Sequence, residues 1–214
     1  MRSEIVARMR GIYVIVDPEH TNGRDVIDVA KTVYSAGAST VQLRYKNAGK
    51  RGLVEQAREI QQIAHDTGKI FIVNDHADVS RIADADGLHV GQKDLRVTDC
   101  RAILDDRQLI GTSNALLEEA LESQNDGADY IAVGAMFSTD TKLDTRPAGV
   151  ETLVKVREAV DTHLVAIGGI NSANIEPVVK GGADSICVAS AITKSDDMER
   201  ATSELVELFE RFSA

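Results

Sequence analysis

In the stretch Ile70-Phe71-Ile72-Val73-Asn74-Asp75, four consecutive apolar residues are followed directly by an amide and a carboxylate. The same arrangement occurs on both sides of it. The run around Val41 ends in Gln42-Leu43-Arg44-Tyr45-Lys46, and Leu88-His89-Val90 leads into Gly91-Gln92-Lys93-Asp94. In a barrel of parallel strands, the carboxyl ends of all strands lie on one rim. These polar side chains are therefore predicted to meet, as they do in the active site of an enzyme.

Strand-like apolar runs alternate with helix-like segments along the whole chain. The runs lie near residues 13–16, 40–43, 70–73, 87–90, 109–111, 130–133, 164–167 and 185–188. Between them, apolar residues recur at helical spacing, as at Leu53, Ala57, Ile60 and Ala64. This alternation predicts an α/β fold with a parallel sheet. We predict closure into a (β/α)₈ TIM barrel rather than an open doubly wound sheet.

The length of 214 residues fits one domain spanning residues 1–214, near the lower end of the range for such barrels. Three near-repeats support one kind of helix-to-strand connection: Ser35-Ala36-Gly37-Ala38, Asn125-Asp126-Gly127-Ala128-Asp129 and Lys180-Gly181-Gly182-Ala183-Asp184. Each places glycine at the end of a helix, where a left-handed residue costs least. We see no linker, low-complexity tract or second domain.

The overall composition restricts the possible partners and location. A formal net charge of -10 argues against nucleic acid, which is bound mainly through Lys and Arg. No apolar run approaches the roughly 20 residues of a membrane span, and a secretory signal is not expected. The two cysteines, Cys100 and Cys187, lack metal-ligand spacing and suit a cytoplasmic protein with reduced thiols. Since the acidic protein repels anions, an anionic substrate needs local cations, backbone N–H groups or a metal.

Two loops are candidates for binding a phosphate. Gly168-Gly169-Ile170-Asn171 follows the seventh strand, and Ala189-Ser190-Ala191-Ile192 follows the eighth. In many barrels these two loops hold a phosphate, because glycine lets the backbone N–H groups approach the anion. The alternative is that two adjacent glycines only make a tight turn. Their position after strand seven favours the phosphate site.

A second anion site is predicted around strands two to four. Arg44 and Lys46 are two residues apart at a strand end, so both can point to the same side. Asp75 and Asp94 add carboxylates at the next two strand ends. One or two carboxylates, completed by water and substrate phosphate oxygens, describe a typical Mg²⁺ site. Each residue alone could be a loop or capping residue, but together they favour a metal–diphosphate site.

Three further features of the sequence bear on the site. Thr139-Asp140-Thr141-Lys142 lies in a polar loop after strand six, where hydroxyls and a lysine could contact phosphate; a surface loop without a role is the alternative. Ser113 could orient a heterocycle through its hydroxyl. No histidine fits a zinc pattern, and His89 is expected to have a packing or hydrogen-bonding role.

Taken together, these motifs resemble the thiamine phosphate synthase family. They are Gln42-x-Arg44-x-Lys46, Asn74-Asp75, Gly91-Gln92-x-Asp94, Thr139-x-Thr141-Lys142 and Gly168-Gly169-Ile170. They occur in the family's order, and the resemblance covers nearly the whole chain. Two departures are Gly134-Ala135, where the family commonly has Gly-Pro, and Tyr45, where an acidic residue is common.

The resemblance implies a transferase that joins 4-amino-2-methyl-5-hydroxymethylpyrimidine diphosphate to a thiazole phosphate, releasing pyrophosphate. It implies that Mg²⁺ is held by Asp75 and Asp94, and that Arg44, Lys46 and Lys142 neutralise the leaving group. The implied ligands of the pyrimidine diphosphate are Gln42, Arg44, Lys46, Asn74, Ser113 and Lys142. The implied ligands of the thiazole phosphate are Thr139, Thr141, Gly169, Ala189 and Ser190.

Three other functions are alternatives to this one. A thiazole tautomerase of similar fold would keep the phosphate loops, but it need not retain Asp75, Asp94, Lys46 and Lys142. A non-catalytic barrel that senses a phosphorylated metabolite would need no metal. Another sugar-phosphate isomerase would leave Thr139-x-Thr141-Lys142 unexplained. The sequence leaves the assembly open, with a homodimer among the alternatives, and predicts neither nucleic-acid nor membrane binding.

Overall fold

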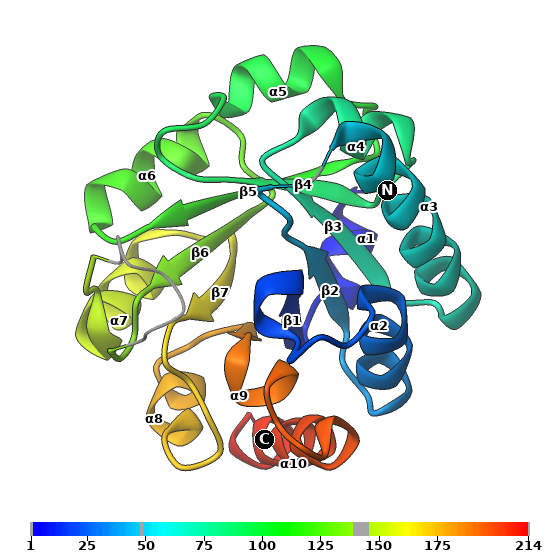
Figure 1. Cartoon of the computed structure of the whole chain (residues 1–214). Helices are drawn as coiled ribbons and strands as arrows, with labels where there is room; N and C mark the ends of the chain where they lie inside the picture. Colours follow the sequence, from blue (N-terminus) through cyan, green and yellow to red (C-terminus); the bar gives the residue numbers. More distant parts are fainter. Residues whose placement is uncertain (1, 48, 139–145, 214) are drawn as a thin grey trace.

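The computed structural model describes residues 2–47, 49–138 and 146–213. Eight parallel strands form a closed barrel in which each strand pairs with the next along the chain and β8 pairs with β1 (Figure 1). The prediction of a (β/α)₈ TIM barrel is therefore confirmed. The strands are β1 (Gly11–Val16), β2 (Thr40–Leu43), β3 (Ile70–Asn74), β4 (Gly87–Val90), β5 (Leu109–Asn114), β6 (Tyr130–Gly134), β7 (His163–Ile167) and β8 (Ser185–Val188).

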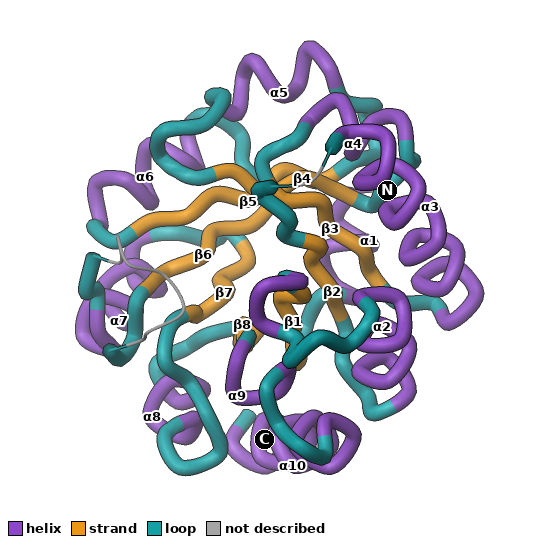
Figure 2. Tube along the Cα trace, viewed as in Figure 1, coloured by secondary structure: helices purple, strands orange, loops and turns teal. Residues whose placement is uncertain are grey.

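Helices surround the barrel and fill the connections between strands (Figures 1 and 2). Most of them pack against the outer face of the strands; α1 precedes the first strand, and the short α9 follows the last. The helices are α1 (Arg2–Arg8), η1 (Pro18–His20), α2 (Val26–Ser35), α3 (Lys50–Thr67), α4 (Ala77–Ile82), α5 (Val97–Ile103), α6 (Leu117–Asn125), α7 (Gly149–Ala159), α8 (Ile175–Lys180), α9 (Ser190–Thr193) and α10 (Met198–Phe212).

Most residues of the strands are apolar, and they are buried on both the inner and the outer face of the barrel. Side chains that point inward fill the barrel, where Tyr13, Ile72, Leu109 and Tyr130 form one cluster. Outward-pointing side chains form a larger cluster with the helices. The stripe predicted on α3 follows this rule, since its four apolar residues, from Leu53 to Ala64, are at most 1% exposed. Burial on both faces explains why short continuous apolar runs mark the strands.

The N-terminal end of the barrel is closed by α1 and by paired charges. Met9 is fully buried after α1, and Arg8 donates to the carbonyl oxygens of Gly68 and Lys69 at distances of 3.2 and 3.1 Å. The aspartates of two near-repeats each accept a backbone N–H of a neighbouring strand. Asp129 accepts from Ile110 at 2.8 Å, and Asp184 does the same at β7. These hydrogen bonds stabilise the N-terminal end of the barrel.

Glycine ends several helices as predicted. Gly37, Gly127 and Gly182, one from each near-repeat, have φ values of 104°, 86° and 93°. Backbone in this left-handed region is costly for other residues. Each glycine thus lets the chain turn from a helix into the next strand.

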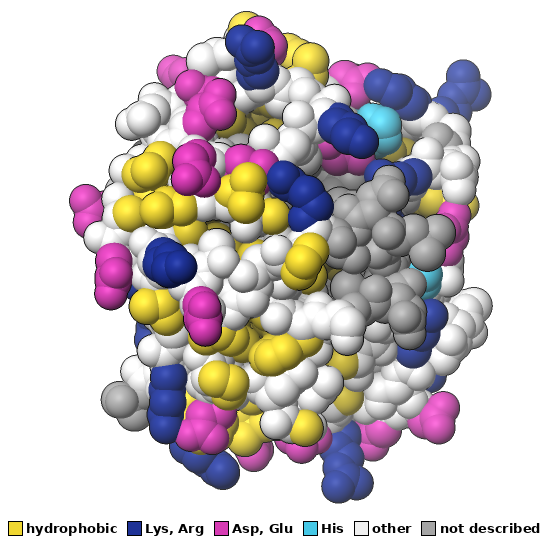
Figure 3. Space-filling model, turned by 90° about the vertical axis from the view of Figure 1, so that its left-hand side faces the viewer, with side chains coloured by type: hydrophobic (Ala, Val, Ile, Leu, Met, Phe, Trp, Pro, Cys, Tyr) yellow, Lys and Arg dark blue, Asp and Glu magenta, His cyan; other side chains and the backbone are white. Residues whose placement is uncertain are grey.

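On the side of the barrel that carries α6 and α7, acidic and basic side chains are interspersed (Figure 3). The negative net charge is therefore not gathered into one patch on that face. Within the described residues, no helix is both long and apolar enough to cross a membrane.

Candidate active site

A cavity of about 810 Å³ opens at the carboxyl ends of the strands. Residues from the loops after every strand except β3 line it, together with the inward-facing ends of several strands. The predicted site residues among them are Arg44, Lys46, Asp94, Ser113, Gly169, Ala189 and Ser190. The convergence predicted from the strand ends is thus observed for most of the described candidates.

Asp94 lines the cavity, and a second carboxylate, that of Asp75, lies beside it. Asp75 follows β3 with a left-handed φ of 60°, and its carboxyl group is close enough to that of Asp94 for the two to interact. Burial, followed by the charge of Asp94 and the hydrogen bond to it, raises the pKa of Asp75, while Lys46 and Asn74 act in the opposite direction. Asp94 also accepts the backbone N–H of Gly91 at 2.8 Å, which fixes its orientation. Two like charges held together in this way favour a bound cation.

The donor set fits Mg²⁺ better than a metal held entirely by protein. Asp75 and Asp94 supply carboxylate oxygens, and no group of three or more His, Cys, Asp or Glu suited to a metal exists within the described residues. Mg²⁺ is usually bound by one or two carboxylates and keeps its remaining sites for water and substrate phosphates. Zinc would need more nitrogen or sulfur ligands. The pair is therefore suited to a magnesium–diphosphate complex.

Arg44 is held in the mouth of the barrel by a carboxylate that the sequence analysis did not single out. It forms an ion pair with Asp17, which is 4% exposed and follows β1 directly. Asp17 also accepts the backbone N–H of Glu19 at 3.0 Å and so caps η1. Because its carboxylate is fixed from two sides, Asp17 can orient the guanidinium toward the cavity. The two residues are 27 positions apart, so no local sequence pattern signals the contact.

Three cations that were not predicted as site residues also reach the cavity. Lys93, Arg146 and Lys194 all line it. Arg146 forms a bidentate pair with Glu119, with nitrogen–oxygen distances of 2.6 and 2.9 Å. No ion pair to Lys194 occurs within the part of the chain that the structure describes. The protein is acidic as a whole, but positively charged side chains are in excess around this cavity.

The glycine pair after β7 is required for packing and leaves backbone donors facing the cavity. Gly168 and Gly169 have φ values of 104° and 67°. A Cβ on Gly168 would lie 2.6 Å from the Cβ of Ala135, and one on Gly169 would lie 2.5 Å from the carbonyl oxygen of Ser138. Close packing against the loop after β6 therefore requires glycine at both positions. This agrees with the alternative that the two glycines make a tight turn. Since no described residue accepts the N–H of Gly169 or Ile170, the same turn also offers donors to an anion.

Five side chains form a continuous hydrogen-bonded chain beneath the cavity, inside the barrel. Gln42 donates to the Tyr13 hydroxyl at 2.6 Å, and the two tyrosine oxygens of Tyr13 and Tyr130 are 3.2 Å apart. The Tyr130 oxygen lies 3.0 Å from His89 Nδ1, and His89 Nε2 lies 2.8 Å from Ser113 Oγ. The hydrogen-bonding role expected for His89 is confirmed. Burial raises the pKa of both tyrosines, so both hydroxyls stay protonated.

Some predicted residues take other positions. Gln42 is 2% exposed and reaches the cavity only through this hydrogen-bonded chain, while Asn74 is half-buried at the end of β3. Thr139, Thr141 and Lys142 lie outside the described residues. Gly134-Ala135, one of the two departures noted above, is joined by a cis peptide bond.

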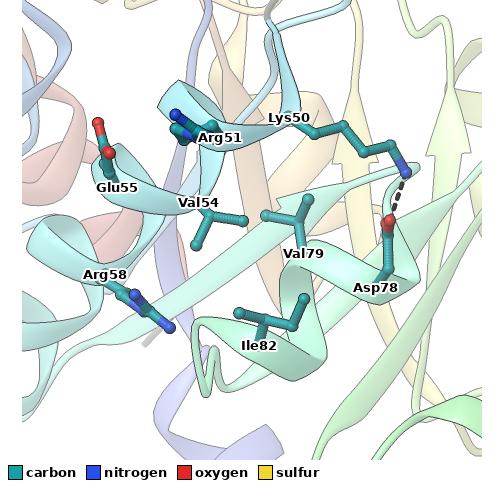
Figure 4. Close-up of a pocket in the computed structure, with 8 residues that line it drawn as sticks. All are labelled: Lys50, Arg51, Val54, Glu55, Arg58, Asp78, Val79 and Ile82. Carbon is teal, nitrogen blue, oxygen red and sulfur yellow. Dashed lines mark hydrogen bonds and ion pairs between the residues drawn. The ribbon is translucent and has the colours of Figure 1, made fainter.

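A second hollow of about 290 Å³ lies on the outside of the barrel, between α3 and α4 (Figure 4). Val54, Val79 and Ile82 form its apolar floor, and Lys50 pairs with Asp78 at its edge. This ion pair lowers the pKa of Asp78. Lys50 and Asp78 satisfy each other instead of converging on a ligand position, so the hollow lacks the character of a binding site.

Comparison with known proteins identifies the family. A family model described as thiamine monophosphate synthase matches residues 12–192. A thiamine-phosphate synthase of Clostridioides difficile is 41% identical over 189 residues, covering 88% of this chain and 90% of that protein. One of Methanoregula boonei is 42% identical, covering 92% and 91%. The chain belongs to the thiamine monophosphate synthase family. It is an enzyme, a transferase.

Solved structures agree with the family assignment. The thiamine phosphate pyrophosphorylase of Pyrococcus furiosus matches with a TM-score of 0.91 and 34% identity, covering 98% of this chain and 99% of that one. A geranylgeranylglyceryl phosphate synthase of Thermoplasma acidophilum matches with a TM-score of 0.72 but only 14% identity. The second match reflects the shared barrel fold alone.

Proposed function

We propose that this family member joins 4-amino-2-methyl-5-hydroxymethylpyrimidine diphosphate to 4-methyl-5-(2-phosphoethyl)thiazole, or to its carboxylated form with loss of carbon dioxide, and releases pyrophosphate. The observation that carries the proposal is the Asp75–Asp94 pair beside Lys46, across one cavity from the glycine turn of Gly168 and Gly169. One side suits a metal-bound diphosphate and the other a phosphate, as two anionic substrates require.

The diphosphate would bind near strands β2 to β4. Arg44, fixed by Asp17, and Lys46 would contact its oxygens as local cations, with Asn74 at the end of the neighbouring strand. Mg²⁺ held by Asp75 and Asp94 would supply charge neutralisation for the departing pyrophosphate. Lys142 is proposed to add a further positive charge, by its position in the family motif.

The thiazole phosphate would bind on the opposite side of the cavity. The N–H groups of Gly169 and Ile170 would donate to its oxygens, with Ala189 and Ser190 at the end of β8 beside them. Thr139 and Thr141 are proposed to complete this site, from the motif alone. Binding through the phosphate fixes the thiazole ring, so its nitrogen can face the pyrimidine methylene.

The bond changes are simple. The carbon–oxygen bond between the methylene and the diphosphate breaks, and pyrophosphate takes the electron pair. The thiazole nitrogen then forms a bond to the electron-poor methylene, which the amino-substituted pyrimidine stabilises. No protein nucleophile is needed, so positioning and charge stabilisation supply most of the rate. Arg44 and Lys46 can do this in a cavity partly shielded from water.

We further propose that the enzyme works in a reducing compartment, the cytoplasm. The support is that Cys100 and Cys187 are both buried free thiols, and burial raises the pKa of each. Such thiols are the less reactive form of cysteine.

The direct test is to incubate the purified protein with both substrates, with and without Mg²⁺, and to assay pyrophosphate and thiamine phosphate. We expect equimolar formation of both products, and only with the metal. Conversion of the thiazole substrate alone, without pyrophosphate, would favour a tautomerase. Tight binding of either phosphate without any product would favour a non-catalytic sensor.

A further inference from the structure

The buried hydrogen-bonded chain beneath the cavity can run in only one direction. Its members are Gln42, Tyr13, Tyr130, His89 and Ser113, and four of the five are at most 7% exposed. A buried polar group without a partner is costly, so every donor in such a chain must meet an acceptor. The question is which atom of each pair carries the proton.

The first link fixes the rest. The amide nitrogen of Gln42 lies 2.6 Å from the Tyr13 oxygen and can only donate. The Tyr13 proton then has one acceptor within the described residues, the oxygen of Tyr130 at 3.2 Å. If Tyr130 donated to Tyr13 instead, the Tyr13 proton would be buried without a partner. Tyr130 therefore receives this proton's hydrogen bond and must direct its own proton elsewhere.

The remaining direction follows through the imidazole. The remaining proton of Tyr130 then points to His89 Nδ1, 3.0 Å from its oxygen, and this assignment makes Nδ1 the unprotonated nitrogen. A neutral imidazole carries its single proton on the other nitrogen. His89 Nε2 then donates to Ser113 Oγ at 2.8 Å. The Ser113 oxygen is occupied as an acceptor, and its own proton remains for the cavity that Ser113 lines.

From this polarity we infer that Ser113 acts as a hydrogen-bond donor to the substrate, and that Tyr130 and His89 are positioning residues that impose this role. The inference rests on the proposed function. The substrate atom that meets Ser113 is then an acceptor, which in an aminopyrimidine is a ring nitrogen and not the amino group. A substrate turned the other way would present a donor to a donor and would be rejected.

The geometry explains why a buried relay is useful at this position. Ser113 lies in β5 and can rotate its hydroxyl freely unless a neighbour fixes it. His89 occupies the adjacent strand β4, in register with Gly111, and stacks on the Tyr130 ring at 5.6 Å between centroids. Gly111 leaves room for that ring, because a Cβ there would lie 1.9 Å from a Tyr130 ring carbon. The ring and the imidazole are thus held rigidly.

The first test measures the proton positions in the free protein. In protein labelled with ¹⁵N-histidine, the chemical shifts of the two ring nitrogens distinguish protonated from unprotonated nitrogen, and His89→Gln assigns the signals. We expect neutral His89 with its proton on Nε2. A proton on Nδ1, or on both nitrogens, overturns the inference. No substrate is involved, so this result does not depend on whether the protein makes thiamine phosphate.

The second test measures the consequence for the substrate. In Tyr130→Phe, His89 loses the donor that fixes its tautomer, so we expect kcat/KM for the pyrimidine diphosphate to fall about tenfold, a typical effect of one hydrogen bond. KM for the thiazole phosphate should stay the same. Tyr34→Phe is the matched control, since the Tyr34 hydroxyl is equally buried but donates to the Ile70 carbonyl at 2.8 Å, away from the chain.

The outcomes separate the possible failures. Equal losses in Tyr130→Phe and Tyr34→Phe, or equal effects on both substrates, would reduce Tyr130 to a packing residue and overturn its positioning role. If wild-type protein formed no thiamine phosphate, the proposed function would fail while the proton position of His89 would still be decided. Thermal unfolding of both variants identifies any effect that comes from misfolding.

Discussion

At the N-terminal end of the barrel, aspartates are paired with donors, whereas at the mouth two aspartates face each other. Asp129 accepts a backbone N–H and the Arg101 guanidinium, and Asp184 is bound by Arg157 at 3.0 Å. Asp75, by contrast, has its pKa raised by burial and by the nearby charge of Asp94. Aspartates thus stabilise the fold at one end. At the other end, two aspartates repel each other, and a bound cation would reduce this repulsion.

This contrast predicts that mutations at the two ends will differ in kind. Losing a carboxylate at the N-terminal end removes hydrogen bonds that the folded chain needs. Losing one at the mouth removes a ligand but also removes a like-charge contact. The first should reduce stability with little change in rate, and the second should reduce the rate with little change in stability.

The largest effect should follow Asp94→Asn. The amide oxygen can still accept the Gly91 N–H, but the charge that holds Mg²⁺ is lost. We expect kcat/KM to fall about 100-fold or more, because metal-ion charge stabilisation is worth several kcal/mol. The free energy of unfolding should stay the same or rise. Pyrophosphate release and urea unfolding measure the two quantities, and a wild-type rate would remove Asp94 from the reaction.

At the opposite end, Asp129→Ala should lower the free energy of unfolding by about 2 kcal/mol, because it leaves the Ile110 N–H without its acceptor and removes the carboxylate that pairs with Arg101. The rate per folded molecule should change less than about twofold. Asp126→Ala is the matched control, because Asp126 lies three residues before Asp129 in the sequence and its side chain is exposed. If both variants unfolded at the same urea concentration, the contrast between the two ends would be wrong.

A smaller effect is expected from Asp17→Asn, which sharpens the contrast because Asp17 is a paired aspartate at the mouth. The substitution keeps an oxygen for the Glu19 N–H but weakens the hold on Arg44. We expect KM for the pyrimidine diphosphate to rise about tenfold, the effect of one charged hydrogen bond. Steady-state kinetics with each substrate varied in turn measures it. An unchanged KM would mean that Arg44 is oriented without Asp17.

The smallest effect concerns pH at the N-terminal end. Burial, with smaller contributions from Arg10 and Arg157 against an opposing one from Asp184, lowers the pKa of His163 to about 4. Because the unfolded chain binds this proton near pH 6.5, stability is fully present above that pH and is lost as pH falls toward 4.

Between pH 7 and pH 6, this group should reduce the free energy of unfolding by about 0.7 kcal/mol. Urea unfolding at both pH values should show a smaller pH dependence in His163→Asn than in wild type. The control His65→Asn removes a histidine that is 79% exposed and should keep the wild-type pH dependence. Equal pH dependence in all three proteins would exclude this role of His163.

Much of the barrel could be predicted from sequence because its strands must be apolar on both faces. Where the observed strands differ from the predicted ones, the difference has a physical cause. The prediction ended the fifth strand at Gly111, yet β5 continues to Asn114 through three polar residues. They remain in the strand because Asn114 satisfies Thr112 at 3.0 Å and accepts from Ser123 at 3.0 Å. Such pairing between elements leaves no periodic signal.

The candidate site could be predicted in part for the same reason. Residues at strand ends, such as Arg44 and Asp94, follow directly from the topology, since the barrel gathers all these ends. Asp17 was missed because its role depends on a contact with a distant strand. Lys194 was missed because it follows a helix turn rather than a strand. Sequence therefore predicts which positions meet, but not which partners orient them.

The most direct measurement is calorimetric titration of Mg²⁺ into the protein with and without pyrophosphate, for wild type and for Asp75→Asn. The account predicts one metal ion per chain, bound well only when pyrophosphate is present, and a large loss of this binding in the variant. Equal Mg²⁺ binding by both proteins, or binding by neither in the presence of pyrophosphate, would contradict the claim that the acidic pair at the mouth holds a metal–diphosphate complex.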